Sequence, residues 1–102
     1  MSMVESFVPG RIRLRSPLLR DADSAAMLQG ALGSVPGVSE ARLNPVTASL
    51  LLTYDAGLLT LDRLAPLLPL LDQVQALERE APSAERLAKL RALLVRALSA
   101  VL

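Results

Sequence analysis

The stretch Arg11-Ile-Arg-Leu-Arg15 alternates charged and apolar side chains, and this alternation decides the fold class. Successive side chains of a β-strand point to opposite faces of a sheet, so a period of two predicts a strand with one apolar and one charged face. Pro9-Gly10 predicts a bend within or before this strand. Ser16-Pro17 predicts its end, because proline lacks an amide donor and restricts the residue before it.

A helix and a hairpin are predicted to follow this strand. Asp21 or Asp23 can cap a helix that ends near Leu32, and a Val-Pro-Gly turn at residues 35–37 comes after it. Residues 38–43 and 48–54 predict two strands, joined by a tight connection at 44–47. The order strand, helix, hairpin is typical of antiparallel α+β domains.

Two proline residues mark the next helix. Thr60 can cap a helix over residues 61–71, which Pro66 and Pro69 are expected to make irregular or kinked. Residues 73–77 predict a short fourth strand at the sheet edge, with Val74 and Ala76 facing inward. The expected architecture is a ferredoxin-like β-α-β-β-α(-β) antiparallel sheet with two helices on one face, formed by residues 1–78.

Residues 79–102 are expected to add an amphipathic helix, which begins at the good capping residue Ser83. Its apolar stripe comprises Leu87, Leu90, Leu94 and Leu98. Such a stripe must be buried somewhere. It can pack within its own domain, pair with a second copy or another protein, or lie on a membrane surface. The near-neutral charge disfavours the membrane.

Composition excludes several classes of function. The 102-residue chain has no cysteine, no histidine and a single lysine, which rules out disulfides, thiolate or imidazole metal sites, and catalysis by Cys or His. It also lacks a glycine-rich phosphate loop, and its serines have no evident activating base. The sequence therefore predicts a protein that is not an enzyme and that carries no cofactor.

Four segments together resemble the heavy-metal-associated domain. They are Val8-Pro-Gly-Arg-Ile-Arg-Leu-Arg15, Val35-Pro-Gly-Val38, Leu43-Asn-Pro-Val-Thr47 and Leu52-Thr-Tyr-Asp55. The resemblance covers roughly residues 7–71 and is to the divergent branch that lacks the Cys-x-x-Cys metal motif. At the family's spacing, the two cysteines would fall at positions 21 and 24, where this chain has Asp21 and Ser24. The resemblance therefore implies the fold without the soft-metal site.

Asp21 and Asp23 are the metal candidates that the sequence offers. Two carboxylates could contribute oxygen ligands to a hard cation such as iron or magnesium, but they are too few for a dedicated site. Aspartate at a helix start also caps the free amides and complements the helix dipole. Capping is therefore the favoured interpretation of both residues.

Arg11, Arg13 and Arg15 are expected to share the open face of the sheet with Arg42, beside Glu40 as a counter-charge. Guanidinium groups on one face could bind an acidic protein or a phosphate, although exposed charges are commonly only solvated or paired. Binding of nucleic acid is not expected, because sheet-based RNA binders stack bases on aromatic side chains and this face has none. Tyr54 is expected to be a half-buried core residue with a wet hydroxyl.

The sequence therefore predicts a cytoplasmic, non-catalytic binding or accessory module. The family resemblance implies a role in metal homeostasis or transport and, as a partner, a metal-transporting P-type ATPase. The alternative is a structural protein that self-associates through the C-terminal helix, with itself as the partner. The sequence leaves open where that helix packs and whether the fourth strand forms.

Overall fold

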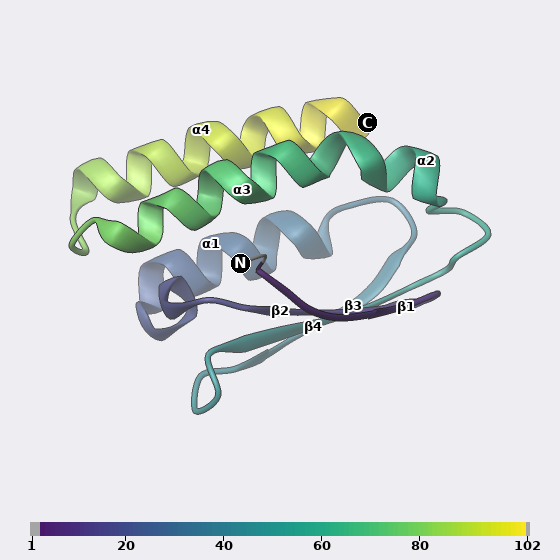
Figure 1. Ribbon diagram of the computed structural model, residues 1–102, viewed down its shortest axis with the longest axis horizontal. Helices are drawn as coiled ribbons and strands as arrows, with labels where there is room; N and C mark the ends of the chain where they lie inside the picture. The colour runs from purple at the N-terminus through teal and green to yellow at the C-terminus, as the bar shows by residue number, and fades with distance from the viewer. Residues whose placement is uncertain (1–2, 102) are drawn as a thin grey trace.

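The computed structural model describes residues 3–101, without the side chains at positions 61, 68 and 101. Within these residues, one antiparallel sheet is covered on one face by helices (Figure 1). The elements are β1 (Val4–Val8), β2 (Arg11–Arg15), α1 (Ala22–Gly33), β3 (Val38–Asn44), β4 (Ser49–Tyr54), α2 (Leu61–Leu64), α3 (Leu68–Ala76) and α4 (Ala84–Val101). Short 3₁₀ turns lie at Pro17–Arg20, Ala65–Leu67 and Leu77–Arg79. The ferredoxin-like α+β prediction is confirmed.

The alternating stretch is the second strand of a hairpin. The strand order is β1-β2-β4-β3, and β1 pairs with β2 through Pro9-Gly10. Gly10 has a φ of +91°, a left-handed conformation that glycine adopts without steric cost. The predicted bend is therefore a chain reversal. It places β1 at the sheet edge, next to β2.

The predicted strand over residues 73–77 is wrong, because these residues belong to α3 and to the turn that follows it. Leu67, Leu70, Leu71, Val74 and Leu77 recur at intervals of three and four, which is the helical period. Val74 and Leu77 are buried on this stripe, whereas Ala76 is exposed. The irregularity predicted at Pro66 is confirmed, because the 3₁₀ turn Ala65–Leu67 separates α2 from α3.

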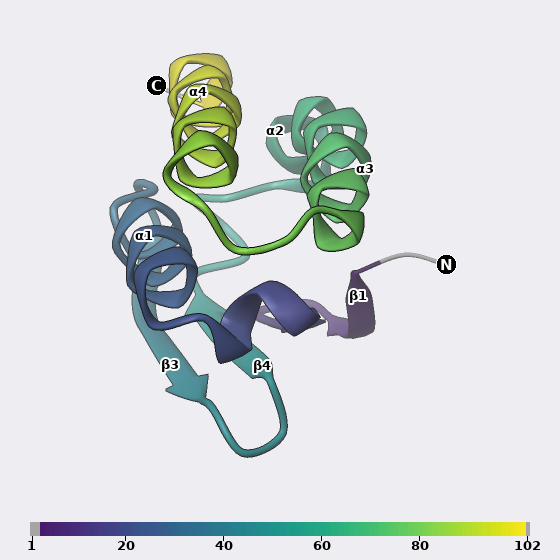
Figure 2. The same cartoon turned by 90° about the vertical axis from the view of Figure 1, so that its left-hand side faces the viewer.

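The C-terminal helix shares the core of the rest of the chain. Leu90 and Leu94 of α4 belong to the same buried cluster as Leu28 of α1, Leu50 of β4 and Val74 of α3. Viewed from the end, α4 lies beside α3 and above α1, on the helical side of the sheet (Figure 2). Of the alternatives open from the sequence, packing within the domain is the one found for Leu90 and Leu94. Within residues 3–101, no helix lies over the opposite face of the sheet.

Candidate functional site: an arginine face and a closed metal loop

Four arginines lie on the face of the sheet opposite the helices. Leu14 on β2 is buried toward the helices, so Arg11, Arg13 and Arg15 project from the other side, where all three are exposed. The strand register sets Arg13 beside Leu51 of β4, and Leu51 beside Arg42 of β3. Side chains opposite each other on one face have Cβ atoms about 5 Å apart. We call Arg11, Arg13, Arg15 and Arg42, together with the half-buried Leu51 between them, the arginine face.

The charges of the arginine face are only partly neutralised. Arg15 Nη1 lies 3.3 Å from Glu5 Oε1, and Arg42 Nη2 lies 2.8 Å from Glu40 Oε1. Both pairs are exposed, and such pairs contribute little to stability. The side chains of Arg11 and Arg13 form no hydrogen bond or ion pair with any residue in the described part of the chain. The structure thus brings the four predicted arginines together, with two free guanidinium groups on the central strand.

The loop before α1 is closed by a side chain from α4. Asp21 Oδ2 accepts hydrogen bonds from Ser24 Oγ at 2.7 Å, from Ser24 N at 3.3 Å and from Arg86 Nη2 at 3.3 Å. The side chain of Arg86 is only 6% exposed, and its Nη1 also donates to the Glu80 carbonyl at 2.9 Å. Asp21 is the N-cap of α1, as predicted. A guanidinium therefore occupies the cation position beside this carboxylate.

The hydrogen bond from the Ser24 hydroxyl is the largest cause of a lowered pKa at Asp21. This hydrogen bond, together with that of the Ser24 amide and the charge of Arg86, holds the pKa of the Asp21 carboxyl below the usual 3.8, against the opposing effect of burial. Asp23 is exposed and lies in the first turn of α1. No group of three His, Cys, Asp or Glu side chains within residues 3–101 could hold a metal ion. Asp21 therefore acts as the cap, whereas Asp23 lies within the first turn, where its charge complements the helix dipole.

Arg86 is a site residue that the sequence analysis did not identify, because a charged residue of an amphipathic helix is ordinarily expected on its polar face. The signal was present: Arg86 lies four residues before Leu90 and eight before Leu94, and so shares their face of the helix. Leu90 and Leu94 are buried, and Leu87 and Leu98 are half-buried. No helix among the described residues is long and apolar enough to cross a membrane.

Residues 2–86 match the family described as Heavy metal associated domain 2. The match spans the sheet, the Asp21 loop and α1 to α3, and it ends at Arg86 in the first turn of α4. No curated protein and no solved structure matches the chain significantly.

Proposed function

The chain belongs to the heavy metal associated domain 2 family, and from this premise we propose that it is a non-catalytic accessory module of metal homeostasis or transport. In this proposal the domain docks on a protein partner and does not carry a soft metal itself. The partner class that the family resemblance implies is a metal-transporting P-type ATPase.

The observation that carries the proposal is the ion pair between Arg86 and Asp21. The resemblance places the family's two metal-binding cysteines at positions 21 and 24. Here those positions hold a carboxylate and a hydroxyl that bond to each other and to a buried guanidinium. A metal ion bound at Asp21 would have to displace Arg86 and leave its charge buried without a counter-charge, which is costly.

The arginine face is the surface that we propose for docking. It projects from the sheet, carries two guanidinium groups without partners among the described residues, and surrounds the half-buried Leu51. Arginine at an interface forms paired hydrogen bonds with carboxylates and packs its stem on apolar groups. A partner that presents acidic side chains around an apolar one would fit this surface.

The experiment that tests the proposal measures metal and partner binding on the same purified protein. Equilibrium dialysis with Cu⁺ and with Zn²⁺ should give no stoichiometric binding below micromolar concentration. Calorimetry with the purified soluble domains of the metal-transporting ATPases of the source organism should give saturable binding. Replacement of both Arg11 and Arg13 by Glu should abolish that binding.

The matched control is the double replacement of Arg91 and Arg96 by Glu. Both arginines are exposed on α4, so this variant has the same net charge with the arginine face intact. It should bind the ATPase domain like the wild type. Stoichiometric soft-metal binding would contradict the loss of the metal site. Equal binding by the two double variants would contradict docking through the arginine face.

Self-association through α4 is the alternative proposal. Its support is the half-buried Leu87 and Leu98, next to the exposed Val95, on a helix that the family match leaves mostly uncovered. Light scattering after size-exclusion chromatography would test it with the replacement Val95→Arg. A dimer that dissociates in this variant would favour self-association over docking on a different protein.

A further inference from the structure

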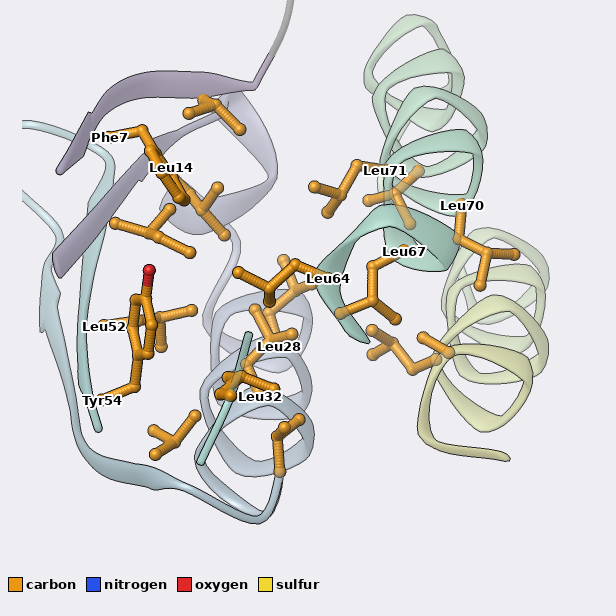
Figure 3. Close-up of a pocket in the computed structure, with 18 of the residues that line it drawn as sticks. Phe7, Leu14, Leu28, Leu32, Leu52, Tyr54, Leu64, Leu67, Leu70 and Leu71 are labelled. Atoms are coloured by element: carbon orange, nitrogen blue, oxygen red, sulfur yellow. The ribbon is translucent and has the colours of Figure 1, made fainter. Parts of the chain in front are cut away.

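An apolar cavity lies between the sheet and the helices (Figure 3). Its described lining includes neither Asp21 nor any residue of the arginine face. Its volume is about 100 Å³, and its lining comes from all four strands and all four α-helices of the described part of the chain. A water molecule needs only about 10–15 Å³ on this measure, and an engineered cavity of about 150 Å³ in another protein stays dry and binds benzene. The space is therefore several times larger than one water molecule needs, and it approaches the size of a cavity that holds benzene.

The cavity follows from the composition of the core. Leucines 64, 67 and 71 reach in from α2, the 3₁₀ turn and α3, opposite Leu28 and Leu32 of α1 and the sheet (Figure 3). The chain has only two aromatic residues, Phe7 and Tyr54, and both line the cavity. With so few large side chains, the broken α2–α3 segment does not fill the space above β1 and β2.

The cavity adjoins a hollow that is open to solvent. This hollow on the outside of the molecule is lined by Phe7, Tyr54 and Leu59, which also line the cavity, and by Thr60 and Asp62. Phe7 lies on the edge strand β1 and is 43% exposed. These three shared residues form the junction between the apolar interior and the surface.

Tyr54 places a polar group at that junction. Tyr54 is 6% exposed, so it is more buried than the half-buried position that the sequence predicts. Its hydroxyl forms no hydrogen bond with any residue in the described part of the chain. It is the one polar side chain in the described lining of the cavity. No buried side-chain polar atom in the described part of the chain lacks a hydrogen-bond partner, so this hydroxyl keeps contact with solvent. A ligand group that reached it would replace a water molecule with a direct hydrogen bond.

The charge at the entrance narrows the ligand class. Asp62 contributes a carboxylate to the described lining of the outer hollow, and that lining includes no lysine or arginine. A ligand with a carboxylate end would meet a like charge there, whereas an amine would meet an opposite charge and an alcohol neither.

We propose that this cavity binds a small apolar molecule that ends in an amine or an alcohol. The apolar body lies among the leucines, and the polar end lies at Tyr54 and Asp62. This site is independent of the docking role proposed above, because it shares no residue with the arginine face or with the Asp21 loop.

The test is a titration of leucine-methyl-labelled protein, followed by NMR, with hexylamine, hexanol and hexanoate. Saturable shifts are expected at the methyl groups of Leu28, Leu67 and Leu71. Hexanoate should bind about two- to fivefold more weakly than hexylamine, the range for one exposed charge pair. The replacement Asp62→Asn should bring that ratio toward one, and Tyr54→Phe should weaken hexanol binding about two- to tenfold.

Cavity filling separates binding inside from binding on the surface. Leu67→Phe adds volume at the cavity wall and should weaken all three ligands at least tenfold, while Leu58→Phe makes the same change at a side chain that lines neither space. Amide spectra establish that both variants fold. The proposal is overturned by an absence of saturable shifts, by undiminished binding in folded Leu67→Phe, or by hexanoate binding as tightly as hexylamine.

Discussion

Among single residues, Asp21 joins the start of α1 to the start of α4 through its ion pair with Arg86. The replacement Asp21→Asn keeps a capping side chain but leaves the buried Arg86 without its counter-charge. We expect the free energy of unfolding to fall by about 1–3 kcal/mol, the range for a hydrogen bond to a charged group. Urea denaturation measures it. Asp23→Asn, in the same turn but exposed, should change stability by less than about 0.5 kcal/mol.

The Asp21 carboxylate also makes the stability of the fold depend on pH, and the direction of that dependence follows from its lowered pKa. Because the folded protein holds the pKa of Asp21 below 3.8, its ionised form stabilises the fold at pH values above the unfolded pKa. That contribution is lost as the pH falls from about 4 through the lower pKa of the folded state. The replacement Ser24→Ala removes the hydroxyl that donates to Asp21 Oδ2 and should therefore raise the pKa of Asp21. Titration of the carboxyl carbon by NMR measures this, and an unchanged pKa would contradict the assigned cause.

Two glycines are expected to respond to alanine with opposite signs. Gly30 lies on α1, and a Cβ there would meet nothing within 4 Å, so Gly30→Ala should stabilise the protein by about 0.5–1 kcal/mol. Gly37 has a φ of +98°, and a Cβ there would lie 3.3 Å from that of Leu59. Gly37→Ala should destabilise the protein by about 1–2 kcal/mol. Thermal unfolding of both variants checks the pair, and a change of equal sign would contradict it.

At the scale of elements, α4 is a part of the core and not an appendage. Leu90 has no exposed surface and packs in the same cluster as residues of α1 and of the sheet. We expect Leu90→Ala to cost about 2–5 kcal/mol, because the lost side chain leaves a cavity. Val95→Ala, on the exposed side of the same helix, should change stability by less than about 0.5 kcal/mol. Chemical denaturation measures the free energy of unfolding of the two variants. Equally small effects would mean that the packing of α4 contributes little to stability.

Local patterns were sufficient to predict most elements. The alternation at Arg11–Arg15, the cap at Asp21 and the prolines around Leu67 each act over a few neighbouring residues. The edge strand β1 was missed, because residues 4–8 become a strand only by pairing with β2. The helix α3 was mistaken for a strand over its last residues, because a five-residue window does not separate a period of two from a period of 3.6.

The candidate site was predictable only where it depends on the alternation of side chains along single strands, β2 and β3. The four arginines share a face because the alternation of a strand fixes side-chain direction. The burial of Arg86 and its contact with Asp21 join residues 65 positions apart, and pairing at that distance depends on how the helices pack. The cavity is likewise a property of packing, because the residues that line it are spread along the chain from Val4 to Ala97.

At the scale of the whole molecule, the chain is nearly neutral but asymmetric in its charge. The net charge is +1, while the arginine face alone holds four arginines with Glu5 and Glu40 as local partners. A local field of this kind steers an acidic partner and is screened by salt. Docking through the arginine face should therefore weaken as the salt concentration rises, mainly through a slower association rate.

Charge reversal separates this surface effect from any effect on the fold. Replacing Arg11 and Arg13 by Glu removes two positive charges and adds two negative ones, and so does replacing Arg91 and Arg96. Both pairs are exposed, so each variant should keep its free energy of unfolding within about 1 kcal/mol of the wild type. Surface plasmon resonance at several salt concentrations should show a strong salt dependence of association for the wild type and the α4 variant. The variant of the arginine face should lose it, and an equal loss in both variants would mean that net charge, not this surface, governs docking.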